Sequence, residues 1–101
     1  MGIGGDCIVT YFKLGSIVCT LGVSERMQKD FDFSEFVRVS LVRHSMGDWG
    51  DLCSEDRQSN ESALVEGSRI LSAYKTDGQP KIWIITEADR SSTCALLPSE
   101  Y

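Results

Sequence analysis

The stretch HSMGDWGDLCSED, residues 44–56, gathers the side chains in this sequence whose types are best suited to chemistry. It holds the only histidine of the chain, His44, and one of its two tryptophans, Trp49, and its charged residues are all carboxylates. A histidine beside carboxylates can transfer protons, and clustered carboxylates can bind a hard divalent cation. The same residues can instead form a recognition surface or a structural turn, so three interpretations compete.

The first interpretation is an enzyme that depends on a divalent metal, with His44 as its acid or base. A later turn, TEADRSST at 86–93, would have to bring its acids to the first stretch. The four ligands would then be Asp48, Asp51, Glu87 and Asp89. The spacing is not that of a calcium-binding loop, and the aspartates can equally cap turns. We therefore assign no catalytic residue, metal ligand or cofactor, and keep the metal enzyme as an alternative.

The second interpretation is a binding surface for a basic protein. Residues 44–66 contain six acidic residues and one basic residue, Arg57. The acids are Asp48, Asp51, Glu55, Asp56, Glu61 and Glu66. With a net charge of −5, the chain lacks the cationic surface on which nucleic-acid affinity depends, so we expect no direct nucleic-acid partner. An acidic surface attracts basic proteins, although it can also be only a solvated face.

The third interpretation is structural. Trp49 lies between Gly47 and Gly50, so its ring either fills the end of the core or stands exposed as an anchor for a partner. We predict that the ring is buried and that the neighbouring carboxylates are outside. We expect Arg90 to pair with Asp48 or Asp51. The residues assigned to this structural loop are His44, Trp49, Glu87, Asp89 and Arg90.

Size and composition place these residues in one soluble domain. The chain has 101 residues, of which 42% are hydrophobic, and this length suits a single domain over 1–101. No apolar run approaches the ~20 residues of a membrane span. No basic segment precedes the first apolar residues, so we expect a cytoplasmic protein without membrane contact. We expect Cys19 and Cys94, which lie in apolar runs, to be core residues.

Three helices are expected. Residues 22–30 suggest a short helix, and apolar residues at helical spacing predict a second over 33–45. Asp32 and Glu35 resemble a capping box at its start. A third helix is expected to be capped by Ser54 and to stop at Gly67, with its first two turns in water.

The rest of the sequence predicts strands. Residues 69–76 and 81–87 flank an Asp77-Gly78 turn and form a hairpin, and 93–97 form a further strand. The run at 81–87 should be central with both faces covered. Residues 8–12 and 16–19 add one strand or a bent pair. The prediction is an α+β fold, an antiparallel sheet of three to four strands with about three helices packed mainly on one face.

Several motifs together resemble a known family. They are RHSMGDWGDL (43–52), ED…NE (55–61), RILSAY (69–74) and IWIITEADRSSTCALLPSEY (82–101). The chain resembles bacterial proteins of roughly this length from plasmids, phages and other mobile elements, with labels such as "plasmid-related protein" or "type I restriction subunit M". Residues 1–11 fall outside the resemblance. A methyltransferase subunit would need a nucleotide-binding sheet and a far longer chain, so the second label brings no chemistry.

The resemblance implies a small acidic accessory protein carried by mobile DNA. Such proteins often protect the element by blocking CRISPR or restriction complexes of the host. An acidic surface can occupy a cationic nucleic-acid channel. The leading hypothesis is therefore a non-enzymatic inhibitor of a host defence nuclease complex. The metal-dependent enzyme and a homodimeric adaptor built on an exposed sheet edge remain the alternatives.

Overall fold

The computed structural model describes residues 12–101, and the expected strand segment at 8–11 lies outside these residues. In chain order the elements are β1 (Ser16–Cys19), α1 (Leu21–Lys29), α2 (Phe31–Ser45), α3 (Ser54–Glu66), β2 (Ile70–Tyr74), β3 (Ile82–Thr86), β4 (Ser92–Leu96) and the 3-10 helix η2 (Pro98–Glu100). Three α-helices and a four-stranded sheet confirm the expected α+β fold.

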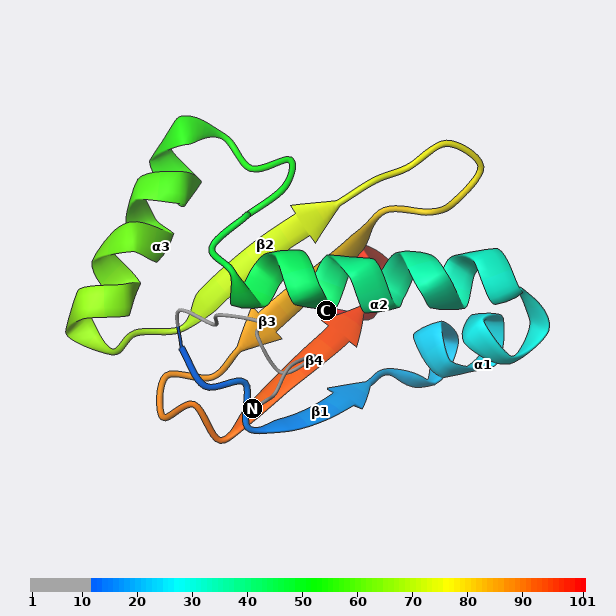
Figure 1. Cartoon of the computed structure of the whole chain (residues 1–101), viewed down its shortest axis with the longest axis horizontal. Coiled ribbons are helices and arrows are strands. Elements are labelled where there is room, and N and C mark those ends of the chain that lie inside the picture. The colour runs from blue at the N-terminus through cyan, green and yellow to red at the C-terminus, as the bar shows by residue number, and fades with distance from the viewer. Residues whose placement is uncertain (1–11) are drawn as a thin grey trace, which may run out of the picture.

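The sheet is mixed rather than purely antiparallel. Its strand order is β1-β4-β3-β2, with β2–β3 and β3–β4 antiparallel and β1–β4 parallel (Figure 1). Parallel strands need a crossover connection, and here all three helices and the β2–β3 hairpin lie between β1 and β4 in the sequence. The expectation of antiparallel pairing throughout is therefore wrong for β1.

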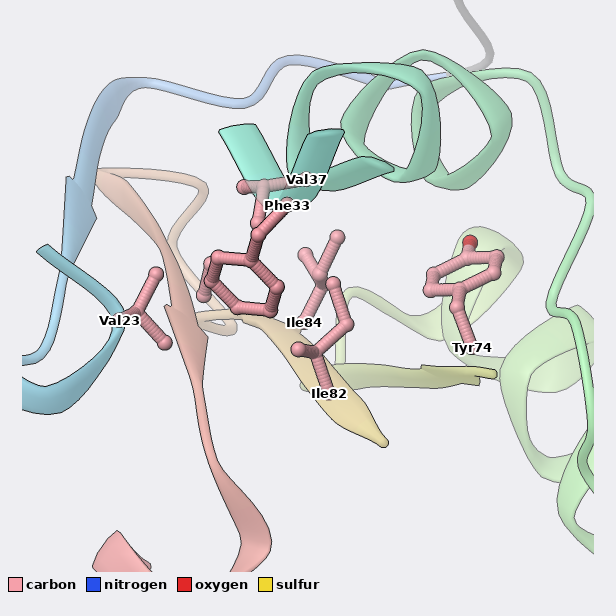
Figure 2. Close-up of a cluster of buried hydrophobic side chains, with 7 residues drawn as sticks. Val23, Phe33, Val37, Tyr74, Ile82 and Ile84 are labelled. Atoms are coloured by element: carbon pink, nitrogen blue, oxygen red, sulfur yellow. The ribbon is translucent and has the colours of Figure 1, made fainter. Parts of the chain in front are cut away.

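The core lies between the helices and one face of the sheet. Figure 1 shows α2 crossing in front of the strands, with α1 beyond the end of β1 and α3 beside β2. In Figure 2, Phe33 and Val37 point from α2 toward Ile82 and Ile84 of β3. Burying these apolar side chains supplies most of the favourable free energy of such a layer.

The opposite face of the sheet is only partly covered, and we call it the open face. By strand register, Leu71, Ile85, Cys94 and Val18 lie in one row across this face. Trp83 is half-buried there, with the Tyr101 ring centroid 5.6 Å from its own. β3 is central, as predicted. The helices cover one of its faces, whereas its side chains on the open face are covered only in part.

Two helix starts differ from the prediction. Asp30, rather than Asp32, caps α2, and its side chain accepts a hydrogen bond from the Phe33 amide at 3.2 Å. The backbone is extended at Asp30 and the helix begins at Phe31, so Asp32 already lies in the first turn. Cys53, rather than Ser54, is the N-cap of α3. The predicted stop at Gly67 is confirmed, with φ of 79°.

The described cysteines carry free thiols, among them Cys19 and Cys94. Cys94 is partly buried on the open face, but Cys19 is exposed because β1 is an edge strand. The expectation that Cys19 is a core residue is therefore wrong. Among residues 12–101, no helix is both long and apolar enough to cross a membrane.

Candidate interaction surface

The loop between α2 and α3 is fastened along the outer edge of β2. The Asp51 amide donates to the Ala73 carbonyl at 2.8 Å, and the Ala73 amide donates to the Trp49 carbonyl at 3.2 Å. Gly50, with φ of 73°, lies so close that a Cβ atom would overlap the Ala73 carbonyl oxygen. Arg57 adds hydrogen bonds from α3 to the carbonyls of Gly50 and Leu52. The loop therefore has one fixed path.

Trp49 fills a second, smaller core beneath this loop. Its side chain is 2% exposed and packs with Ala63 and Ile70. The indole Nε1 donates to Glu61 Oε2 at 2.9 Å, so the polar atom of the ring is satisfied. The prediction of a buried ring is confirmed. Glu61 therefore also has a structural contact, because its carboxylate on α3 accepts the hydrogen bond of the loop residue Trp49.

His44 is the centre of a buried polar chain. Its side chain is 0% exposed, and its ring nitrogens contact Ser72 Oγ and Thr86 Oγ1, the second at 2.8 Å. Thr86 Oγ1 lies 2.7 Å from Thr93 Oγ1, and Thr93 donates to the Leu14 carbonyl at 2.7 Å. His44 thus sits inside the domain, where it touches no solvent.

The direction of the chain follows from its last bond. Since the Thr93 hydroxyl proton goes to a carbonyl, Thr86 must donate to Thr93 and accept from His44 Nε2. Nε2 then carries the proton, and Nδ1 accepts from the Ser72 hydroxyl. This arrangement uses neutral imidazole, and burial lowers the pKa of His44 to about 4. Through these two contacts the buried ring of His44 connects α2 with β2 and β3.

Arg90 does not pair with a carboxylate of the loop, which corrects the prediction. With φ of 60°, it turns its guanidinium toward the end of α3. There it donates to the carbonyls of Ser68 at 2.6 Å and Ala63 at 3.1 Å. Asp48 pairs instead with Arg43 at 2.7 Å, and this hydrogen bond lowers the pKa of the Asp48 carboxyl. Arg90 caps a helix C-terminus, where positive charge is favourable.

The carboxylates proposed for a metal site are not brought together. Glu87 and Asp89 follow β3, at the end of the sheet where Thr86 pairs with Ile70, whereas the loop lies against Ala73, nearer the other end of β2. Asp89 accepts a hydrogen bond from the Ser91 amide and so closes its own turn. Within residues 12–101, no group of three or more His, Cys, Asp or Glu side chains could hold a metal ion.

The six acids between residues 44 and 66 are all exposed, and we call them the acidic face. Asp48 is paired with Arg43, whereas no basic nitrogen of the described chain forms a salt bridge with any of the others. The residues of α3 from 54 to 59 are exposed on every side, as predicted for its first two turns. Figure 1 shows this part of α3 at the margin of the molecule. The carboxylates of the acidic face are therefore accessible to solvent.

Asn60 is the residue that sequence reasoning missed. It is buried, and its side-chain amide donates to the Leu71 carbonyl at 2.6 Å and accepts from the Leu71 amide at 3.2 Å. It thus imitates a neighbouring strand at the edge of β2. The sequence offered one signal for this burial. Asn60 stands where α3 changes from polar to apolar residues, and Ala63 follows one turn later.

No protein-family model, curated protein or solved structure matches the chain. The resemblance to mobile-element proteins stays a prediction.

Proposed function

We propose that this protein is a non-enzymatic inhibitor that binds a basic surface of a host defence nuclease complex, of the CRISPR or restriction type, through its acidic face. The observation that carries the proposal is the projecting first half of α3. Glu55 and Asp56 are exposed there, and Arg57, the basic residue beside them, is turned back onto the loop.

The scaffold supports this role because it holds the acids in place. Asn60 fixes the middle of α3 to β2, Arg90 bonds to its end, and Glu61 connects it to the buried Trp49. Because the backbone that carries these acids is already fixed, little backbone entropy is lost when they bind. It also steers a cationic partner into contact, which speeds association at low salt and slows it as salt screens the charges.

The test compares two double variants with the same change in charge. Glu55→Gln with Asp56→Asn removes two charges from the acidic face, whereas Glu25→Gln with Asp77→Asn removes two exposed charges elsewhere. Purified CRISPR effector and type I restriction complexes are used in pull-downs and in DNA-cleavage assays. We expect the wild type and the second variant to bind and inhibit one class of complex. The first variant should bind it about tenfold or more weakly.

Two results would contradict the proposal. One is unimpaired DNA cleavage by every complex at saturating protein, with no binding. The other is equal loss of binding in both variants, which would mean that net charge rather than the acidic face matters.

A further inference from the structure

The outer edge of β1 has no pairing partner within the described part of the chain, residues 12–101. In its parallel pairing with β4, the amides of Ser16 and Thr20 donate to β4-side carbonyls at 2.9 and 3.1 Å. Backbone groups alternate in direction along a strand, so the N–H and C=O groups of Ile17 and Cys19 point away from the sheet. Nothing within residues 12–101 pairs with them.

This edge carries almost none of the features that keep edge strands monomeric. Residues 14–24, LGSIVCTLGVS, contain no charged residue and no proline. Ile17 is 55% and Val18 48% exposed. Natural edges are usually blunted by lysine, proline, bulges or a covering element. Within residues 12–101, the feature that limits pairing at β1 is its short length of four residues.

We propose that β1 pairs in antiparallel register with β1 of a second copy of this chain, about a two-fold axis at Val18. In this register Ile17 of each copy lies opposite Cys19 of the other, and their outward backbone groups form four hydrogen bonds. Val18 faces its own counterpart as the non-hydrogen-bonded pair. The two sheets then become one sheet of eight strands.

The strand register favours a second copy as the occupant. Leu71, Ile85, Cys94 and Val18 form an apolar row across the open face that ends at the unpaired edge. The two-fold axis at Val18 continues this row into the same four residues of the second copy. Cross-strand pairs of β-branched side chains stabilise such contacts.

The distribution of charge is compatible with the same occupant. Two copies of a chain with a net charge of −5 repel each other unless their acids are kept apart. The acidic face lies beside β2, and β2 and β1 are the two opposite edges of the sheet. Pairing through β1 therefore places the acidic faces at the two ends of the dimer. This interface does not depend on the proposed nuclease target.

The first test uses two matched substitutions, Val18→Lys on the edge and Val39→Lys on α2, since these valines are 48% and 45% exposed. Light scattering and sedimentation velocity are measured over a dilution series of the full chain. We expect a dimer for the wild type and for Val39→Lys. Val18→Lys should raise the dimer dissociation constant about 100-fold or more, because two ammonium groups would meet at the axis. The two variants should melt alike at concentrations where both are monomers.

The second test determines the register. In a background with all four cysteines replaced by serine, Val18→Cys is compared with Ile17→Cys under mild oxidation. Non-hydrogen-bonded partners have Cα atoms about 4.5 Å apart, within the range of a disulfide. Val18→Cys should therefore give a covalent dimer, whereas Ile17→Cys should not.

Several outcomes would overturn the proposal. A wild type that is monomeric at every concentration would do so, and slow amide exchange at Ile17 and Cys19 in that monomer would mean that residues 1–11 cover the edge. A dimer that survives Val18→Lys, or cross-links through position 17 rather than 18, would also overturn it.

Discussion

The two edges of the sheet are treated in opposite ways. At the β2 edge, the outward backbone groups of Leu71 are bonded by Asn60, and those of Ala73 by Trp49 and Asp51. At the β1 edge, the corresponding groups of Ile17 and Cys19 have no partner among residues 12–101. One edge is closed by the chain itself, whereas nothing in the described residues closes the other.

The difference between the two edges shows how the closure of the β2 edge is connected with the acidic face. The segments that close the β2 edge, the α2–α3 loop and the middle of α3, also carry the acidic face. Closing the edge therefore fixes the position of the charges. Among residues 12–101 no such segment lies along β1, which is the edge that we propose to pair with a second copy. The following predictions test this contrast.

The largest effect is expected from Trp49→Ala, which removes the filling beneath the closed edge. Loss of a buried aromatic side chain costs about 3–5 kcal/mol of unfolding free energy, measured by chemical denaturation. Trp49→Phe keeps most of the volume and loses the Glu61 hydrogen bond, so it should cost clearly less. An unchanged denaturation midpoint in Trp49→Ala would mean that the loop does not depend on its ring.

The second prediction concerns pH and the chain of hydroxyls behind the closed edge. Burial lowers the pKa of His44 from 6.5 to about 4, so the unfolded chain takes up a proton before the folded one does. Stability is therefore fully present above about pH 6.5 and falls as the pH drops toward 4. The His44 contribution to this loss is about 3 kcal/mol.

His44→Gln isolates this contribution, since it removes the titrating group and leaves the carboxylates unchanged. Unfolding free energies at several pH values between 7 and 4 are compared for the two proteins. The wild type should lose more stability than the variant over this window. Parallel curves would show that His44 binds as many protons in the folded as in the unfolded chain, so that its pKa is not lowered by folding, contrary to the expectation.

The fold was predictable where the determining pattern is local. The stop at Gly67 and the hairpin around Gly78 each depend on one residue with positive φ inside a short motif, and both are present. The parallel pairing of β1 was not predictable, because strands 16–19 and 92–96 are joined by nearly the whole chain. Local alternation of residues carries no information on the direction of such a pairing.

The candidate site divides in the same way. The burial of Trp49 followed from a large ring between two glycines, which is a local pattern. The partner of Arg90 did not, because four carbonyl groups compete with the carboxylates and only the packed turn decides between them. Asn60 escaped notice since a polar residue in a polar helical segment resembles any solvated one.

A pair of glycine substitutions measures how tightly the loop is held against β2. Gly50→Ala and Gly78→Ala both place a side chain at positive φ, 73° and 80°, which costs about 1–2 kcal/mol in each case. A Cβ atom at Gly78 meets open space, whereas at Gly50 it overlaps the Ala73 carbonyl. Gly50→Ala should therefore cost about 2 kcal/mol more, since the two backbone hydrogen bonds of the loop are lost as well. Equal losses in thermal or urea denaturation would show that the contact with Ala73 is loose.

The smallest effect is expected at the open edge. Ile17→Thr changes an exposed side chain on β1, and Ile70→Thr makes the same change at a fully buried position on β2. At Ile70 the new hydroxyl would be buried away from water, and part of the apolar contacts of isoleucine would be lost. The free energy of unfolding should therefore fall by about 1–3 kcal/mol. At Ile17 the hydroxyl stays hydrated, and threonine suits a strand as well as isoleucine does, so the change should be within about 0.5 kcal/mol. Urea denaturation has to be measured at concentrations low enough that the proposed dimer is dissociated, because pairing would stabilise the wild type further. If Ile17→Thr costs as much as Ile70→Thr under these conditions, then β1 is covered within the monomer and the contrast between the two edges does not hold.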